Sequence, residues 1–271
     1  MREGLAAVLL TGSLAFVSAE ARPAVDPVAH PSSIIRTPSV SIEPAVVELD
    51  AGAGTSFLRE ISVRNGTPFE LQFNVVVEDV LVHGGKRLFR PAGESRGSIA
   101  ATVVVDPAAL VLQPGQSGRV SVLITIPHET AIRAVAIFFR SRTNDASARG
   151  PAISLNIGAL VTLRLSGKPD LFSGPVLLRE EGSRISLVQT LTNRGSELLI
   201  AKGTFALVGE GGELHTLVHL PPTRLLPGET TNLEAESPRA LPPGRYRAIS
   251  TFASDERLVV REASMQLGEP K

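Results

Sequence analysis

Apolar and polar residues alternate along most of the chain from Val40 onward. The clearest stretches are residues 71–77 and 120–126, in which every second residue is apolar. A period of two places apolar side chains on one face of a β-strand, and helical spacing is nearly absent. The pattern predicts strands near residues 40–49, 57–65, 69–81, 99–112, 118–127, 132–141 and 152–166, and then near 172–179, 184–192, 197–209, 212–220, 229–236, 244–253 and 257–267.

Turn-forming residues occur in two similar series between these strands. Asn-Gly and Pro-Gly pairs favour tight turns, so each series predicts short strands joined by turns. The fold class we expect is all-β, with two tandem immunoglobulin-like antiparallel β-sandwiches. The first copy is longer, and its surplus around residues 83–86 and 93–98 predicts an added hairpin or loop. The series are Asn65-Gly66, Leu112-Gln113-Pro114-Gly115 and Arg133–Phe138, and then Asn193-Arg194-Gly195, Leu226-Pro227-Gly228 and Arg247–Phe252.

The N-terminus predicts export. Residues 1–19 have a basic Arg2, an apolar stretch and a Val17-Ser18-Ala19 ending, which is typical of a cleaved signal peptide. Residues 20–38 form a Pro-rich linker, residues 39–166 the first module and residues 167–271 the second. We expect a periplasmic or secreted protein with no membrane insertion after signal cleavage.

Composition and motifs exclude several classes of function. The formal net charge is +0, which argues against nucleic acid as a partner, and the chain has no cysteine for a disulfide or a thiolate. Residues 93–97 match G-x-S-x-G, but a loop and a strand surround them where a nucleophile elbow needs a strand and a helix. His215, His219 and Glu213 share one strand face but lack further ligands. We expect no enzyme activity, no cofactor and no metal.

The segment from Ile153 to Leu165 is the candidate binding element, because every odd position in it is apolar. Two interpretations stay open. The odd face lies wholly in the core of the first module, or the start of the strand extends past the core. In the second case Ile153, Leu155 and Ile157 bind a partner strand by β-augmentation.

The first module resembles the PapD-like periplasmic pilus chaperones over roughly Val40 to Arg164. The resemblance implies a chaperone or assembly factor for surface-fibre subunits, with a pilin-like protein as partner and Ile153, Leu155 and Ile157 as the strand that pairs with it. The matching motifs are Val40-Ser41-Ile42, Ile61–Asn65, Phe69–Val75, Val105-Asp106-Pro107, Leu112–Gly115, Ile126–Arg133 and the alternating strand 153–165.

The family also binds the subunit's terminal carboxylate through two basic residues. The corresponding positions here carry Val46 and Thr162, which are not cationic, so the anchor residues are not matched. Arg164 and Lys168 lie nearby and are the possible carboxylate anchor.

A second resemblance is to paired immunoglobulin-like surface proteins of Gram-positive bacteria, of the type found beside WxL proteins. It rests on Ile42-Glu43-Pro44, Val63–Thr67 and Ile126-Pro127. The alternative function is therefore a secreted or cell-surface immunoglobulin-like module that binds polysaccharide or protein.

Overall fold

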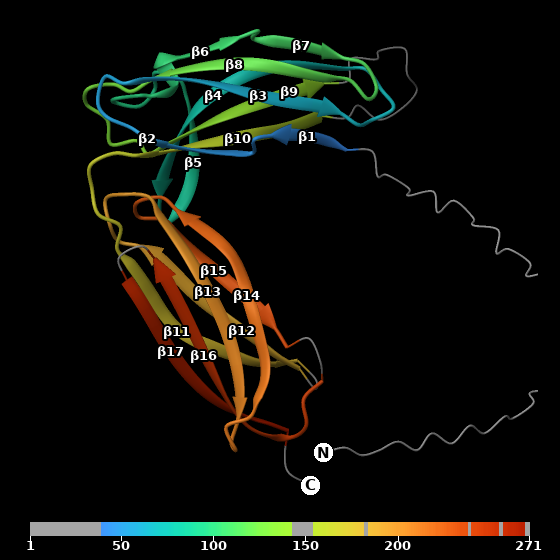
Figure 1. Cartoon of the computed structure of the whole chain (residues 1–271), viewed down its shortest axis with the longest axis vertical. Coiled ribbons are helices and arrows are strands. Elements are labelled where there is room, and N and C mark those ends of the chain that lie inside the picture. Colours follow the sequence, from blue (N-terminus) through green and yellow to red (C-terminus); the bar gives the residue numbers. More distant parts are fainter. Residues whose placement is uncertain (1–38, 143–153, 182–183, 238–239, 255–256, 269–271) are drawn as a thin grey trace, which may run out of the picture. The chain divides into compact units, whose positions relative to one another are not determined.

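The first ten strands form two facing sheets (Figure 1). The computed structural model describes residues 39–142, 154–181, 184–237, 240–254 and 257–268. The signal peptide, the linker and Ile153 lie outside the described residues. The strands are β1 (Val40–Glu43), β2 (Val46–Asp50), β3 (Ser56–Asn65), β4 (Leu71–His83), β5 (Lys86–Pro91), β6 (Val103–Asp106), β7 (Ala109–Leu112), β8 (Ser117–Thr125), β9 (Ala134–Arg142) and β10 (Ser154–Arg164), with a 3₁₀ turn at Ala100–Thr102.

One sheet of the first module has the strand order β1-β3-β8-β6, and the other has β2-β10-β9-β4-β5 with β7 also paired to β4. Their inner faces carry the alternating apolar residues seen in the sequence. Ile61, Val122, Ile137 and Val161 are almost completely buried there. Ala159, Val161 and Leu163 of β10 are buried in this core, and Leu155 and Ile157 pack against it half-buried.

The second module repeats the arrangement with sheets β11-β12-β15 and β14-β13-β16-β17. The rings of Phe205 and Phe252 meet edge to face at 5.8 Å in its core. The tandem β-sandwich fold predicted from the sequence is confirmed. The strands are β11 (Leu171–Glu181), β12 (Arg184–Asn193), β13 (Leu199–Gly209), β14 (Leu214–Leu225), β15 (Thr230–Glu236), β16 (Gly244–Ser254) and β17 (Arg257–Leu267).

The repeat seen in the sequence is a repeated hydrogen-bond arrangement. The side-chain amide of Asn65 donates to the carbonyls of Phe69 at 2.7 Å and Leu112 at 2.9 Å. The side chain of Asn193 does the same to Glu197 at 2.7 Å and Leu225 at 2.9 Å. Each asparagine ends a strand, and its side chain satisfies carbonyls that the turn leaves without a ladder partner. Asn65 is fully buried, so it is a structural turn residue.

Two strands predicted from the pattern are wrong in detail. Residues 40–49 form β1 and β2, which belong to opposite sheets, and residues 99–112 form the 3₁₀ turn, β6 and β7. Each change of sheet follows a proline, Pro44 or Pro107, which has no N–H to continue a ladder. The predicted extra hairpin is β4–β5, closed by Gly84 and Gly85, both with positive φ. None of the helices in the described part of the chain is long and apolar enough to cross a membrane.

Candidate functional site: the open edge of strand β10

Strand β10 is paired along most of its length on one side and only near its end on the other. Strand β9 pairs with Ser154 to Thr162, whereas β2 pairs only with Leu160 to Arg164. Among the described residues, no strand pairs with residues 154–159 on the side away from β9. We call this stretch the open edge of β10.

The direction of the main-chain groups along the open edge follows from the neighbouring hydrogen bonds. The N–H of Leu160 donates to the carbonyl of Ala45 at 2.9 Å, and the N–H of Leu163 donates to the carbonyl of Arg133 at 2.8 Å. The main-chain N–H and C=O groups of even-numbered residues in β10 therefore point toward β2, and those of odd-numbered residues point toward β9. Continued backward, this alternation directs the N–H and C=O groups of Ser154, Asn156 and Gly158 toward the open edge.

The open edge exists because the first part of the chain changes sheet. Strand β1 lies beside β10 (Figure 1), but its register partners are in β3 of the opposite sheet, from Val40 opposite Asn65 to Glu43 opposite Ser62. After Pro44 the chain joins β10 as β2, in parallel and only from Val46 onward. The start of β10 thus borders the place where the two sheets part.

Apolar side chains line this border. Leu155 and Ile157 on β10 and Val40 and Ile42 on β1 are half-buried, and all four pack against the core of the first module. Farther along β10, Ala159, Val161 and Leu163 are almost completely buried. The core is therefore less covered at this border than farther along β10. Leu155 and Ile157 stay predicted binding residues, and Ile153 lies outside the described residues.

The outer face of the sheet next to the open edge carries an aromatic ring and a cation. The Phe138 ring lies across Gly158, where an added Cβ would be 2.8 Å from a ring carbon. The Arg140 guanidinium lies 5.3 Å from the centre of the same ring, and one of its N–H groups donates to Glu78 at 2.7 Å. Asn156, on this face too, is exposed. A partner strand at the open edge would meet these groups on its outer side.

The predicted carboxylate anchors lie beyond the open edge. Thr162 is fully buried, and its hydroxyl donates to the carbonyl of Val47 at 3.3 Å, so it is a structural residue. Arg164 is the last residue of β10 and is half-buried, and Lys168 follows in an exposed position. Neither lies next to residues 154–159 along the strand. Their role as anchors stays a prediction.

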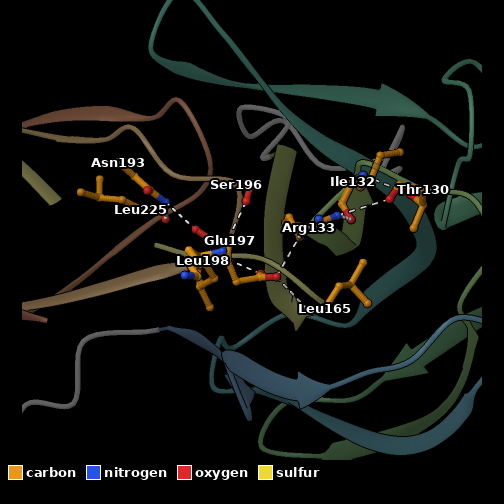
Figure 2. Close-up of polar contacts among 10 residues, drawn as sticks. Thr130, Ile132, Arg133, Leu165, Asn193, Ser196, Glu197, Leu198 and Leu225 are labelled. Atoms are coloured by element: carbon orange, nitrogen blue, oxygen red, sulfur yellow. Dashed lines mark hydrogen bonds and ion pairs between the residues drawn. The ribbon is translucent and has the colours of Figure 1, made fainter. Parts of the chain in front are cut away.

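A buried ion pair connects the two sandwiches close to the end of β10 (Figure 2). Nε of Arg133, just before β9, is 3.5 Å from Oε2 of Glu197, and the two side chains are 12% and 7% exposed. The same carboxylate accepts the N–H of Leu165 at 2.9 Å and, through its other oxygen, the N–H of Leu198 at 2.9 Å. Glu197 therefore holds the chain that leaves β10.

Further side-chain contacts join the two sandwiches. Arg87 on β5 donates to Glu229 at 2.8 Å and to the carbonyl of Arg224 at 2.9 Å. Arg224 in turn bonds Glu48 on β2 at 2.8 Å. An apolar cluster lies beside them, and these contacts link β2 and β5 of the first module to the second module. The fully buried members of the cluster are Val80, Ala134, Ala136, Leu198 and Leu226.

Sequence reasoning missed Glu197 and the main-chain groups of the open edge. A signal for Glu197 was present, because it occupies the place of Phe69 in the repeat, four residues after the asparagine. Phe69 is 56% exposed and Glu197 is 5% exposed. A carboxylate buried where the first copy has an exposed ring indicates a role that only the second copy has. The open edge left no such signal, since it depends on where a distant strand begins.

In the part of the chain that the structure describes, the other polar groups form no comparable site. Within the described ranges, no group of three or more His, Cys, Asp or Glu residues is placed to hold a metal ion. Glu213 bonds His215 at 3.0 Å on the surface of β14 and its preceding turn. Hydrogen bonds from its own backbone N–H and from His215 lower the pKa of Glu213. This pair is a local surface contact.

Comparisons with known proteins return similarities of fold to fimbrial chaperones. The CsuC–CsuE chaperone–subunit complex of Acinetobacter baumannii is 11% identical, covers 83% of this chain and 97% of that chain, and has a TM-score of 0.42. The Salmonella enterica SafB chaperone in complex with the SafA pilin is 16% identical, covers 85% of this chain and 98% of that chain, and has a TM-score of 0.41. The E. coli chaperone DraB is 16% identical, covers 84% of this chain and 98% of that chain, and has a TM-score of 0.39. No protein-family model and no curated protein matches the chain.

Proposed function

We propose that this chain is an exported, non-enzymatic assembly chaperone that binds a surface-fibre subunit by pairing β10 with a strand edge of that subunit. The observation that carries the proposal is the open edge, where Ser154, Asn156 and Gly158 direct main-chain groups away from β9. Unpaired strand edges bind extended segments through backbone hydrogen bonds, with adjacent side chains giving specificity.

The partner class follows from the motifs of the first module, which resemble those of PapD-like pilus chaperones. A pilin-like subunit with an exposed strand edge fits the open edge chemically, because both partners gain ladder hydrogen bonds. Its apolar side chains would also cover the half-buried Leu155 and Ile157 and the neighbouring Val40 and Ile42. The N-terminal signal pattern supports action in the periplasm. The modules in this proposal are residues 39–166 and 167–271, with Arg164 or Lys168 as the carboxylate anchor.

The sharpest test changes one N–H of the open edge. Asn156→Pro removes a donor that points away from β9, leaves every β9 hydrogen bond in place, and proline is tolerated at a strand edge. Asn156→Ala is the matched control, because it removes the same exposed side chain but keeps the N–H. The readout is the amount of pilin-like protein, identified by mass spectrometry, that co-purifies from the exported fraction.

We expect the wild type and Asn156→Ala to retain this subunit and Asn156→Pro to lose most of it, with an unchanged circular dichroism spectrum. Full retention by the folded Asn156→Pro variant would refute pairing at the open edge. A wild-type protein that carries no pilin-like subunit, but binds polysaccharide or another protein, would favour the alternative of a surface binding module. Replacing Leu155 and Ile157 with Asp tests the same site, although both side chains also contact the core.

A further inference from the structure

The outer face of the β14-β13-β16-β17 sheet is apolar at its centre. Leu217 lies directly opposite Ala206, and Ala206 lies opposite Ile249, so one row crosses three strands. Val208 lies two residues along β13 from this row. On β17 the row ends at Glu262, opposite Ile249, and the apolar Val260 and Leu258 lie two and four residues away from it along β17, opposite Thr251 and Ala253. We call these six residues the outer apolar face: Ala206, Val208, Leu217, Ile249, Leu258 and Val260.

The outer apolar face is separate from the core of the second module. The alternate residues of the same strands, such as Phe205, Ala248 and Val259, fill that core, and none of the six packs against it. Leu217 is 49%, Leu258 65% and Val260 44% exposed. A solvated sheet face ordinarily carries polar side chains, so an apolar centre of this kind indicates a surface that another molecule covers.

Four charges beside the apolar row lie in two pairs, and the exposed Lys202, opposite Ala253, is a further cation on this face. Arg247 and Glu262 are 3.8 Å apart and both 53% exposed, and Arg245 and Glu210 are 3.6 Å apart. By register, Arg247 is opposite Val208 and Glu262 is opposite Ile249, so both border the apolar centre. A strongly charged partner gains nothing from such a surface, whereas a surface with both signs is complementary to itself. The formal net charge of +0 also means that two copies do not repel each other.

We infer that the outer apolar face binds a second copy of this chain and forms a two-fold symmetric dimer through the second module. In a two-fold interface each copy contributes the same patch, and two β-sheets pack face to face about 10 Å apart. Arg247 of one copy then faces Glu262 of the other. The interface shares no residue with the open edge of β10, which stays available for pairing.

The first test is the mass of the purified protein in solution, measured by sedimentation or by light scattering after size exclusion. We expect twice the mass of one chain for the wild type and a return to one chain for Leu217→Glu and for Val260→Glu, with unchanged circular dichroism. The control is Leu58→Glu, at a 64% exposed position of the first module, which should leave the dimer intact. A wild type that stays monomeric at the highest concentration reached would overturn the inference.

The second test separates a dimer contact from a local structural role. Arg247→Glu places two acids on the face, and Glu262→Arg places two bases on it, so each variant alone should be monomeric because like charges meet across the two-fold axis. An equimolar mixture of the two variants should regain the dimer mass, because opposite charges then meet at both contacts. Failure of the folded mixture to associate, while the wild type is dimeric, would refute the proposed arrangement.

Discussion

The buried pair of Arg133 and Glu197 gives the most demanding test of how the two sandwiches are connected. Glu197→Ala leaves Arg133 without its carboxylate and also removes the acceptor of the Leu165 and Leu198 N–H groups. Removing one partner of a buried ion pair costs roughly 3–5 kcal/mol. We therefore expect Glu197→Ala to lower the free energy of unfolding by about 4 kcal/mol.

A double-mutant cycle isolates the pair. Because no unpaired charge stays buried, Arg133→Met combined with Glu197→Ala should cost at least ~1.5 kcal/mol less than the sum of the single changes. The assay is urea denaturation followed by circular dichroism, and Glu197→Ala should also separate one unfolding transition into two. The exposed pair of Arg119 and Glu60, 3.4 Å apart, is the control and should couple by less than about 1 kcal/mol. Additive effects at Arg133 and Glu197, with a single transition retained, would refute the reasoning.

Three further predictions follow from particular contacts. Asn65→Ala and Asn193→Ala should each cost about 2–4 kcal/mol in urea denaturation, because each leaves two carbonyls without a donor; a neutral effect at either position would contradict their equivalence. Gly158→Ala should destabilise the fold by about 1–3 kcal/mol through the Phe138 ring, and Phe138→Ala in the same chain should remove most of that cost. Burial, and secondly the charge of Glu213, raise the pKa of Tyr246 above its ordinary value of 10.0. Because the chain has one tyrosine and no tryptophan, an absorbance titration reports the ionisation of Tyr246 alone. The folded state holds this proton more tightly than the unfolded state, so stability should decline as pH rises from about 10 toward the folded pKa; ionisation at or below 10 would contradict the burial argument.

Local pattern was sufficient for most strands. Alternation and turn pairs located the strands of both modules to within a few residues, because each strand has one buried face and the turns need Gly, Pro or Asn. Strand β14 runs farther than expected, to Leu225, through Pro221 and Pro222. Proline fits there because β14 is at the edge of its sheet. An edge position is a property of the assembled sheet, so no window of the sequence could reveal it.

The same limit applies to the candidate site. The alternation of the strand at 153–165 placed Leu155 and Ile157 on its odd face, and in the structure both pack half-buried against the core. Whether the backbone of residues 154–159 is paired depends on where β2 begins, more than a hundred residues earlier in the chain, and on the change of sheet after Pro44. Pairing partners so distant in sequence are set by the packing of the whole module, and the alternation of one strand carries no record of them.

Hydrogen exchange of individual β10 amides, followed by NMR, tests the central claim most directly. In the free protein, the amides of Leu155, Ile157 and Ala159 should be protected by β9, whereas those of Ser154, Asn156 and Gly158 should exchange rapidly. Binding of the co-purified fibre subunit should then slow the second set and leave the first set unchanged. Equal protection of both sets in the free protein, or no change in the second set when the subunit binds, would contradict the account.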